Sequence, residues 1–175
     1  MLSYLYVAAA VMLRLIPHPW NLTPMGAMFL FSGATFARKR DSLLAPMAAL
    51  LISDFAVNAV LYQGRFGWWH PSQWAGFLAV GLIGWTLRGR ISVLRVAGAS
   101  LAGSVAFFLI SNFGVWTGWT MYPPTFDGLI ACYAAALPFF RQTVIGDAAY
   151  AALMFGSWHW LRRRLPHRVD LISAS

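Results

Sequence analysis

Three clusters of basic residues divide an otherwise apolar chain of 175 residues. The segments between them are rich in Leu, Ala, Phe, Val and Trp. The clusters hold ten of the thirteen Lys and Arg residues, namely Arg38, Lys39 and Arg40, then Arg88, Arg90 and Arg95, then Arg162, Arg163, Arg164 and Arg168. This alternation is typical of an integral membrane protein whose cytoplasmic loops carry the positive charge. The charge pattern therefore predicts both a membrane location and an orientation.

Composition supports this interpretation. Hydrophobic residues make up 59% of the chain and charged residues 10%, whereas soluble domains carry about 25% charged residues. The net charge of +8 comes from residues at the ends of apolar runs, which fits anionic lipids better than nucleic acid. The single cysteine, Cys132, cannot form an intrachain disulfide. The first apolar run has no basic residue before it and ends at Arg14, so we expect no cleaved signal peptide.

A membrane-spanning helix needs roughly 20 mostly apolar residues. The apolar runs predict spans at residues 2–16, 23–37, 43–63, 73–87 and 93–111. The last apolar region, residues 126–161, is too long for one straight helix and contains Pro138. If both of its halves crossed, residues 162–164 would lie opposite the other basic clusters. We therefore expect a half-helix or interfacial helix at residues 126–138 and a sixth span at residues 142–161.

The predicted fold is thus an all-α membrane protein with six transmembrane helices, one integral membrane domain over residues 1–175, and cytoplasmic termini. Three loops, at residues 17–22, 64–72 and 112–125, then face outward, and they are rich in Trp, Pro, Asn and His. An interfacial aromatic belt explains single Trp residues, but aromatic walls with a few polar groups also suit a flat organic ligand. The candidate ligand-binding residues in these loops are His18, Trp20, Asn21, Trp68, Trp69, His70, Asn112, Trp116 and Tyr122.

Four ionisable side chains fall within or near the spans: Arg14, Asp54, Arg141 and Asp147. A charge at the centre of a bilayer costs about 2.5–3.5 kcal/mol on insertion scales, so it usually has a partner or faces a cavity. The sequence leaves both readings open, as two structural ion pairs or as cavity residues. Asn58 lies one turn after Asp54 on the same helix face. We add Asp54, Asn58 and Arg141 to the candidate ligand-binding residues.

Most kinds of catalysis are disfavoured. The chain has no glutamate, no Ser-His-Asp set, no Gly-rich phosphate loop and no Cys-x-x-Cys. Two loop histidines are too few for a zinc site. An intramembrane enzyme using Asp54, Arg141 and Asp147 would lack a nucleophile–base pair, so we expect no enzyme. Small residues spaced by four, such as Ala99 and Gly103, indicate close helix packing in the fifth span.

Several stretches resemble a family of small bacterial membrane proteins of uncharacterised function. They are residues 14–28 (Arg-Leu-Ile-Pro-His-Pro-Trp-Asn-Leu-Thr-Pro-Met-Gly-Ala-Met), residues 111–116 (Ser-Asn-Phe-Gly-Val-Trp), and the Cys-Tyr, Leu-Pro-Phe-Phe, Gly-Asp and Phe-Gly motifs between residues 132 and 156. That family in turn resembles the substrate-binding S-components of energy-coupling factor (ECF) vitamin transporters. S-components have six helices, cytoplasmic termini, and a vitamin site closed by the outer loops after the first, third and fifth helices. The three predicted outer loops occupy those positions.

The resemblance implies a protein of the bacterial cytoplasmic membrane that binds a vitamin or similar molecule for uptake. Cobalamin is the first candidate substrate, and no cofactor is required. S-components usually carry an Ala-x-x-x-Ala face for docking to an ECF coupling subunit and its ATPases. Here Ala8, Ala9 and Ala10 are consecutive, so we expect this chain to dock differently or to act alone.

The best-described kind of solitary S-component-like protein for cobalamin uses an outer-loop cysteine as cobalt ligand, and the predicted outer loops of this chain contain no cysteine. His70 in a comparable loop is the candidate axial ligand to a cobalt macrocycle. The alternative function is a non-transporting accessory subunit of a larger membrane complex.

Overall fold

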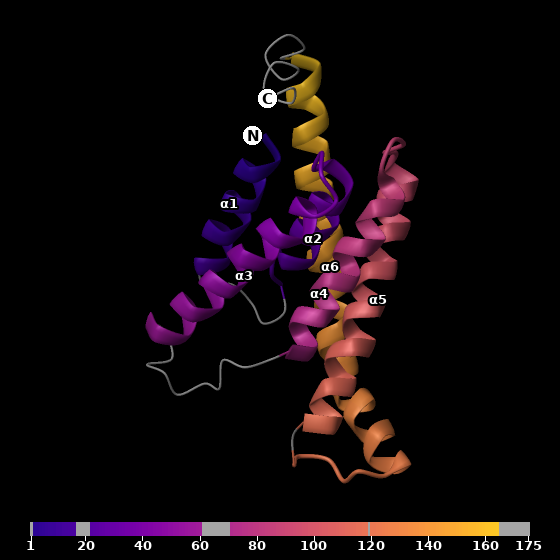
Figure 1. The fold of residues 1–175 in the computed structure, drawn as a ribbon. Helices are drawn as coiled ribbons and strands as arrows, with labels where there is room; N and C mark the ends of the chain where they lie inside the picture. The colour runs from indigo at the N-terminus through magenta and orange to yellow at the C-terminus, as the bar shows by residue number, and fades with distance from the viewer. Residues whose placement is uncertain (1, 17–21, 61–70, 119, 165–175) are drawn as a thin grey trace.

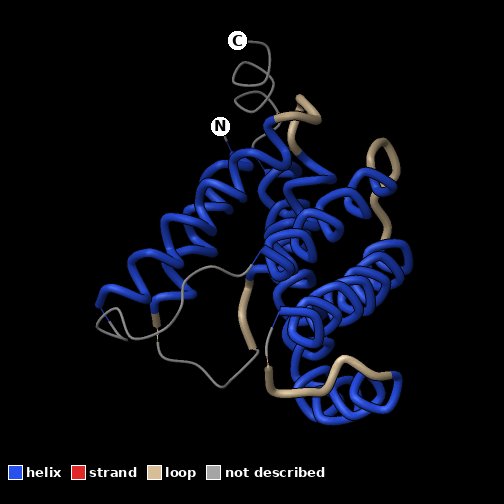
Figure 2. Tube along the Cα trace, turned by 60° about the horizontal axis from the view of Figure 1, so that its bottom comes forward, coloured by secondary structure: helices blue, strands red, loops and turns tan. Residues whose placement is uncertain are grey.

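The computed structural model describes residues 2–16, 22–60, 71–118 and 120–164. These residues form helices joined by short loops, with no strand among them (Figure 2). The helices are α1 (Leu2–Leu15), α2 (Met25–Thr35), α3 (Asp41–Val60), α4 (Pro71–Gly84), α5 (Val93–Gly118) and α6 (Phe126–Arg164), and a 3₁₀ turn, η1 (Trp85–Leu87), extends α4. The all-α prediction is confirmed, and α1 to α4 begin and end within three residues of the predicted spans.

The prediction of a separate half-helix before the last span is wrong. α6 is one continuous helix of 39 residues with Pro138 inside it. Proline is tolerated in membrane helices because neighbouring side chains and helices satisfy the backbone groups that it frees. The polar residues that follow Pro138 do not end the helix, since Thr143 donates a hydrogen bond to the carbonyl oxygen of Phe139 (3.1 Å).

The predicted outer loop at residues 112–125 is shorter than expected, because α5 continues to Gly118. The side chains of Ser111, Asn112 and Thr117 each donate to a carbonyl oxygen one turn earlier, at 2.7, 2.8 and 3.1 Å. Gly114 lets this last part of α5 lie against Ser72 at the start of α4. The Ser-Asn-Phe-Gly-Val-Trp motif therefore extends a helix.

α2 lies at the centre of the bundle. Ten of its eleven residues are buried, and it contacts each of the other five helices. A helix that is apolar all round is stable only when it is enclosed. It crosses α4 closely at Gly33, where an added Cβ would lie 2.2 Å from the carbonyl oxygen of Gly81. The small residues of α5 also pack inside the bundle, and Gly103 faces Val80 of α4.

The described residues of the three basic clusters, 38–40, 88–95 and 162–164, lie at one end of the molecule, at the top of Figure 1 with the start of α1 and the end of α6. Arg88 donates to the carbonyl oxygen of Gly33 (2.8 Å), and Lys39 lies 5.0 Å from the ring centre of Trp85, so the first two clusters are adjacent. At the same end Tyr6 of α1 bonds Ser157 of α6 (2.9 Å).

The α5–α6 hairpin lies at the opposite end and reaches farthest from the basic clusters (Figure 1).

Three helical stretches are long and apolar enough to cross a membrane: Asp41–Ala59, Val93–Gly118 and Phe126–Arg164. They remain largely uncovered within the protein, and large apolar side chains such as Ile52 (68% exposed), Leu94 (83%) and Phe126 (74%) lie on the outside. An outer surface of this kind is typical of helices whose surroundings are lipid.

Candidate functional site

A polar cavity of about 310 Å³ lies between the helices, and every one of α1 to α6 contributes to it. It is lined by Arg14, Thr23, Met25, Gly26, Val57, Gln73, Phe77, Phe107, Thr143 and Asp147. Arg14 and Val57 come from the last turns of α1 and α3, and Gln73 from the first turn of α4. The cavity is therefore on the side away from the basic clusters.

Arg14 lines the cavity as part of an ion pair. Its guanidinium donates to Asp54 Oδ1 (2.5 Å) and to Ser53 Oγ (2.6 Å). The other carboxylate oxygen of Asp54 accepts a hydrogen bond from Trp74 Nε1 (3.1 Å). The sequence left open whether these charges pair or face a cavity; Arg14 and Asp54 do pair, and theirs is the one ion pair among the described residues. Its two charges balance, so the Arg14–Asp54 pair presents little net charge to the cavity.

Asp147 reaches the cavity from α6, and only 6% of it is exposed. Its Oδ2 accepts a hydrogen bond from Ser104 Oγ of α5 (2.6 Å). The carboxylate lies against Gly26 in the first turn of α2, where an added Cβ would be 2.2 Å from Oδ1. The free N–H groups of a helix's first turn favour an adjacent negative charge. The fold thus gives this carboxylate one hydroxyl donor and the positive end of α2.

With Arg14 and Asp54 paired, a second ion pair would have to join Arg141 to Asp147, and these two residues do not pair. Arg141 is exposed and does not line the cavity. The physical reason is helical spacing, because Thr143 and Asp147 lie four residues apart and share the face toward the cavity, whereas Arg141 lies on another face of α6.

Aromatic rings form the apolar wall of the cavity. The rings of Phe77 (α4) and Phe107 (α5) lie 4.5 Å apart between centroids, and Phe77 also stacks on Phe29 of α2 at 5.5 Å. Thr23, Gln73 and Thr143 add polar side chains to the same lining. An apolar wall with a few placed polar groups is the usual composition of a small-molecule site.

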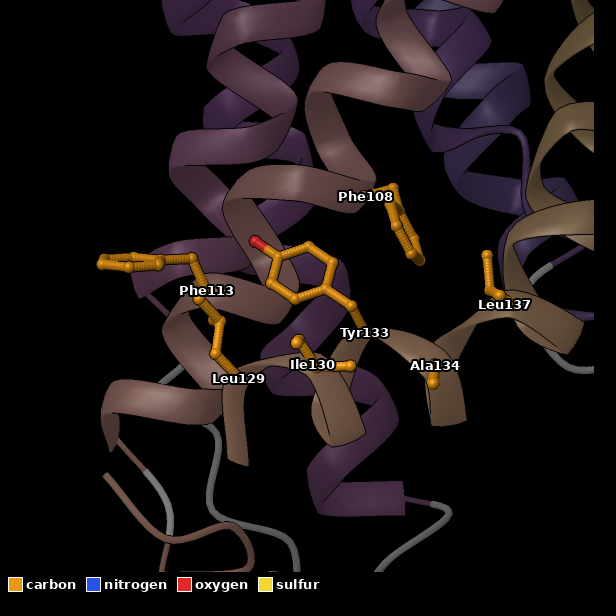
Figure 3. A pocket seen from close by; sticks show the side chains of 7 residues that line it. All are labelled: Phe108, Phe113, Leu129, Ile130, Tyr133, Ala134 and Leu137. Carbon is orange, nitrogen blue, oxygen red and sulfur yellow. The ribbon is translucent and has the colours of Figure 1, made fainter. Parts of the chain in front are cut away.

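A second hollow is an apolar groove of about 470 Å³ on the α5–α6 hairpin. Figure 3 shows Tyr133 in its middle, with Phe113 and Leu129 on one side and Phe108 and Leu137 on the other; Ile130 and Ala134 complete the lining. The Tyr133 hydroxyl already donates to the carbonyl oxygen of Leu109 (2.6 Å). This groove offers a ligand no charged group, so we take the polar cavity as the candidate site.

The predicted site residues divide into three groups. Asp54 supports Arg14 behind the cavity wall, and Asn58 follows the lining residue Val57, with its buried Oδ1 lacking a hydrogen-bond partner among the described residues. Asn112, Trp116 and Tyr122 belong to the α5–α6 hairpin outside the cavity, where Trp116 Nε1 donates to the carbonyl oxygen of Pro123 (3.0 Å). The other predicted residues, His18, Trp20, Asn21, Trp68, Trp69 and His70, lie outside the described residues.

Sequence reasoning missed Thr23, Gly26, Gln73, Ser104 and Thr143 as parts of this site. One signal was available, since Thr143 lies one helical turn before Asp147. The roles of Gly26 and Ser104 depend on contacts between helices that are distant in the sequence, which no local pattern reveals.

Comparison with known protein families matches residues 1–168 to a family of unknown function, DUF6580. No curated protein and no solved structure matches the chain. The match agrees with the expected family of uncharacterised membrane proteins, while the likeness to ECF S-components stays a prediction. Because the family model covers nearly all 175 residues, the chain belongs to the DUF6580 family of unknown function.

Proposed function

We propose that this protein is a substrate-binding membrane protein that takes up a small organic molecule through the polar cavity. The observation that carries the proposal is a cavity with an enclosed carboxylate, bordered by all six helices, at the end away from the basic clusters. Interior ionisable residues in membrane proteins usually mark a binding site or a pathway.

Helix lengths support a cavity that reaches the middle of the membrane. Asp147 precedes Arg162 by 15 residues in α6, and its partner Ser104 follows Arg95 by nine residues in α5. At 1.5 Å per residue these distances are about 22 and 14 Å. A hydrocarbon core is about 30 Å thick, so the Asp147–Ser104 contact would lie between its centre and its outer half. With the basic clusters on the cytoplasmic side, the cavity would occupy the outer half of the membrane.

The short helices account for the hollow. α1 and α4 have 14 residues each and α2 has 11, giving lengths of about 21, 21 and 17 Å. These lengths are below the thickness of the hydrocarbon core. If all six helices cross the membrane, as cytoplasmic termini require, the short ones leave a space at one end of the bundle. The cavity begins where α2 begins, at Met25 and Gly26.

The volume of the cavity bears on the ligand. Small-molecule sites occupy about 300–1,000 Å³, and 310 Å³ is at the lower limit. A cobalamin, with its corrin ring and nucleotide arm, is far larger than this space. We therefore favour a smaller vitamin-like ligand, and keep cobalamin as the less favoured substrate, which would have to bind outside the cavity. Transfer inward would use an ECF-type partner or a rearrangement of this chain alone.

The test is co-purification with a variant that fills the cavity. Thr143→Trp places an indole in the lining, and Thr117→Trp is the matched control. Both threonines donate to the carbonyl oxygen four residues earlier at 3.1 Å, but Thr117 is exposed on the far end of α5. The wild type, both variants and an unrelated membrane protein are purified in mild detergent, and the molecules released on denaturation are identified by mass spectrometry.

We expect one compound to be enriched with the wild type and with Thr117→Trp, and to be absent from Thr143→Trp. If the compound is retained by Thr143→Trp, the site is not this cavity. If no compound is enriched and the wild type binds none of a panel of vitamins and small metabolites, the proposed function is refuted.

A further inference from the structure

We infer that the ligand of the polar cavity carries a positively charged nitrogen, a protonated amine or similar organic cation, that pairs with Asp147. This inference rests on the proposed function, because it specifies the ligand of that same site. It follows from the charges on the cavity wall, the position of the carboxylate, and the aromatic side of the lining.

Among the described residues, the charges in the cavity wall and directly behind it sum to one negative charge, because Asp54 behind the wall neutralises Arg14 and leaves Asp147. Arg14 and Asp147 are the two formally charged groups in the lining, and Arg14 is held by Asp54 just behind it. Asp147 has no cationic partner within hydrogen-bonding range in the described part of the chain. In a site with low-dielectric walls, a single unpaired charge attracts the opposite charge strongly. The ligand class that completes this pairing is a cation.

The carboxylate is positioned to accept such a group. Ser104 donates its hydrogen bond to Oδ2 of Asp147, and Oδ1 lies beside Gly26. Because Gly26 has no side chain, the carboxylate can lie at the cavity wall. An ammonium group has three donors. One can go to Asp147, and the side-chain oxygens of Thr143 and Thr23 in the same lining can accept the others.

The aromatic wall fits the rest of such a ligand. The rings of Phe77 and Phe107 lie 4.5 Å apart between centroids, tilted to one another, and border the same space. Phenyl faces bind apolar bodies and also attract cations that lie within about 6 Å of the ring centre. A compact amine with an apolar or aromatic body therefore matches both the charged and the aromatic residues of the lining, within about 310 Å³.

The test uses three probes of one shape and different charge: 2-phenylethylamine, which is cationic at neutral pH, neutral 2-phenylethanol, and anionic phenylacetate. Their affinities for the detergent-purified full-length protein are measured by calorimetric titration. The variant is Asp147→Asn, which keeps the shape and removes the charge. The control is Asp127→Asn, because Asp127 is an exposed aspartate of the same helix, outside the cavity.

We expect the amine to bind the wild type at least about tenfold more tightly than the alcohol, because one charge-assisted hydrogen bond contributes enough binding free energy for a difference of this size. Asp147→Asn should reduce the amine to the affinity of the alcohol and leave the alcohol unchanged, whereas Asp127→Asn should change neither. If Asp147→Asn does not fold, the order of affinities of the three probes for the wild type tests the inference by itself.

Equal binding of amine and alcohol, or preferred binding of phenylacetate, overturns the inference of a cationic ligand and leaves the proposed binding function standing. Failure of all three probes to bind also overturns it. The co-purification experiment decides separately whether the cavity holds a ligand at all, so the two proposals can fail independently.

Discussion

Replacing Gly26 with alanine places a methyl group where the Asp147 carboxylate lies. The added Cβ would be 2.2 Å from Oδ1 and 2.9 Å from Oδ2, whereas such contacts stay above 3.0 Å, so Oδ1 must retreat by about 0.8 Å. The carboxylate is fixed on its other side by Ser104 at 2.6 Å, and a displacement of this size lengthens or breaks that hydrogen bond.

The expected cost of Gly26→Ala follows from three contributions. Overpacking in a tight interior costs roughly 1–3 kcal/mol, and a hydrogen bond to a charged group contributes about 1.5–3 kcal/mol. Alanine returns up to about 1 kcal/mol through its higher helix propensity. From the middle of each range, the free energy of unfolding should fall by about 3 kcal/mol. Chemical denaturation in mixed micelles, followed by tryptophan fluorescence, measures this change.

A double-mutant cycle identifies the cause. In an Asp147→Ala background the carboxylate is absent, so Gly26→Ala should cost little there, and the coupling energy should be about 3 kcal/mol. The control is Gly156→Ala in α6, because nothing lies within 4 Å of the position of its added Cβ. A cost below about 0.5 kcal/mol, or an equal cost in both backgrounds, would refute the contact between Gly26 and Asp147.

Three further predictions concern packing and orientation. Arg14→Met should lower the free energy of unfolding by about 2 kcal/mol, because it leaves a mostly buried Asp54 carboxylate without its cation. Adding Asp54→Leu should recover part of this loss. A double variant less stable than Arg14→Met in the same denaturation assay would contradict the prediction. Gly33→Ala should cost about 3 kcal/mol, since the added Cβ meets backbone atoms of α4 that cannot rotate away, and a thermal unfolding midpoint equal to that of Gly156→Ala would contradict the close crossing. In a cysteine-free background, a cysteine at Thr120 should react with an impermeant maleimide on intact cells and a cysteine at Ser92 only after lysis; labelling of both from one side would reject the assigned orientation.

Most of the fold could be predicted from the sequence because charge and apolar runs are local signals. The basic clusters at residues 38–40, 88–95 and 162–164 gave the right division into helices and do lie together at one end. The errors fell on α5 and α6, where polar residues looked like helix ends. Ser111, Asn112 and Thr143 instead bond carbonyl oxygens of their own helix, and this local pairing is compatible with a continuing helix.

The candidate site was less predictable because it depends on pairing between helices. Arg14, Asp54 and Asp147 were recognisable as unusual charges in apolar segments. Which of them would pair was left open, because Asp54 pairs with Arg14 across 40 residues and Asp147 with Ser104 across 43. The outer-loop residues attracted attention through composition, yet Asn112 and Trp116 support the α5–α6 hairpin through hydrogen bonds to backbone oxygens.

The enclosure of α2 has a consequence for biogenesis. A segment of 11 residues is too short to be held by lipid alone, and its walls are supplied by α4, α5 and α6, which leave the ribosome after it. The glycine of its crossing, Gly33, has no counterpart until residue 84 has been made. In the nascent chain, α2 should therefore remain unpacked until synthesis is nearly complete. During this interval membrane chaperones and proteases would act on the protein.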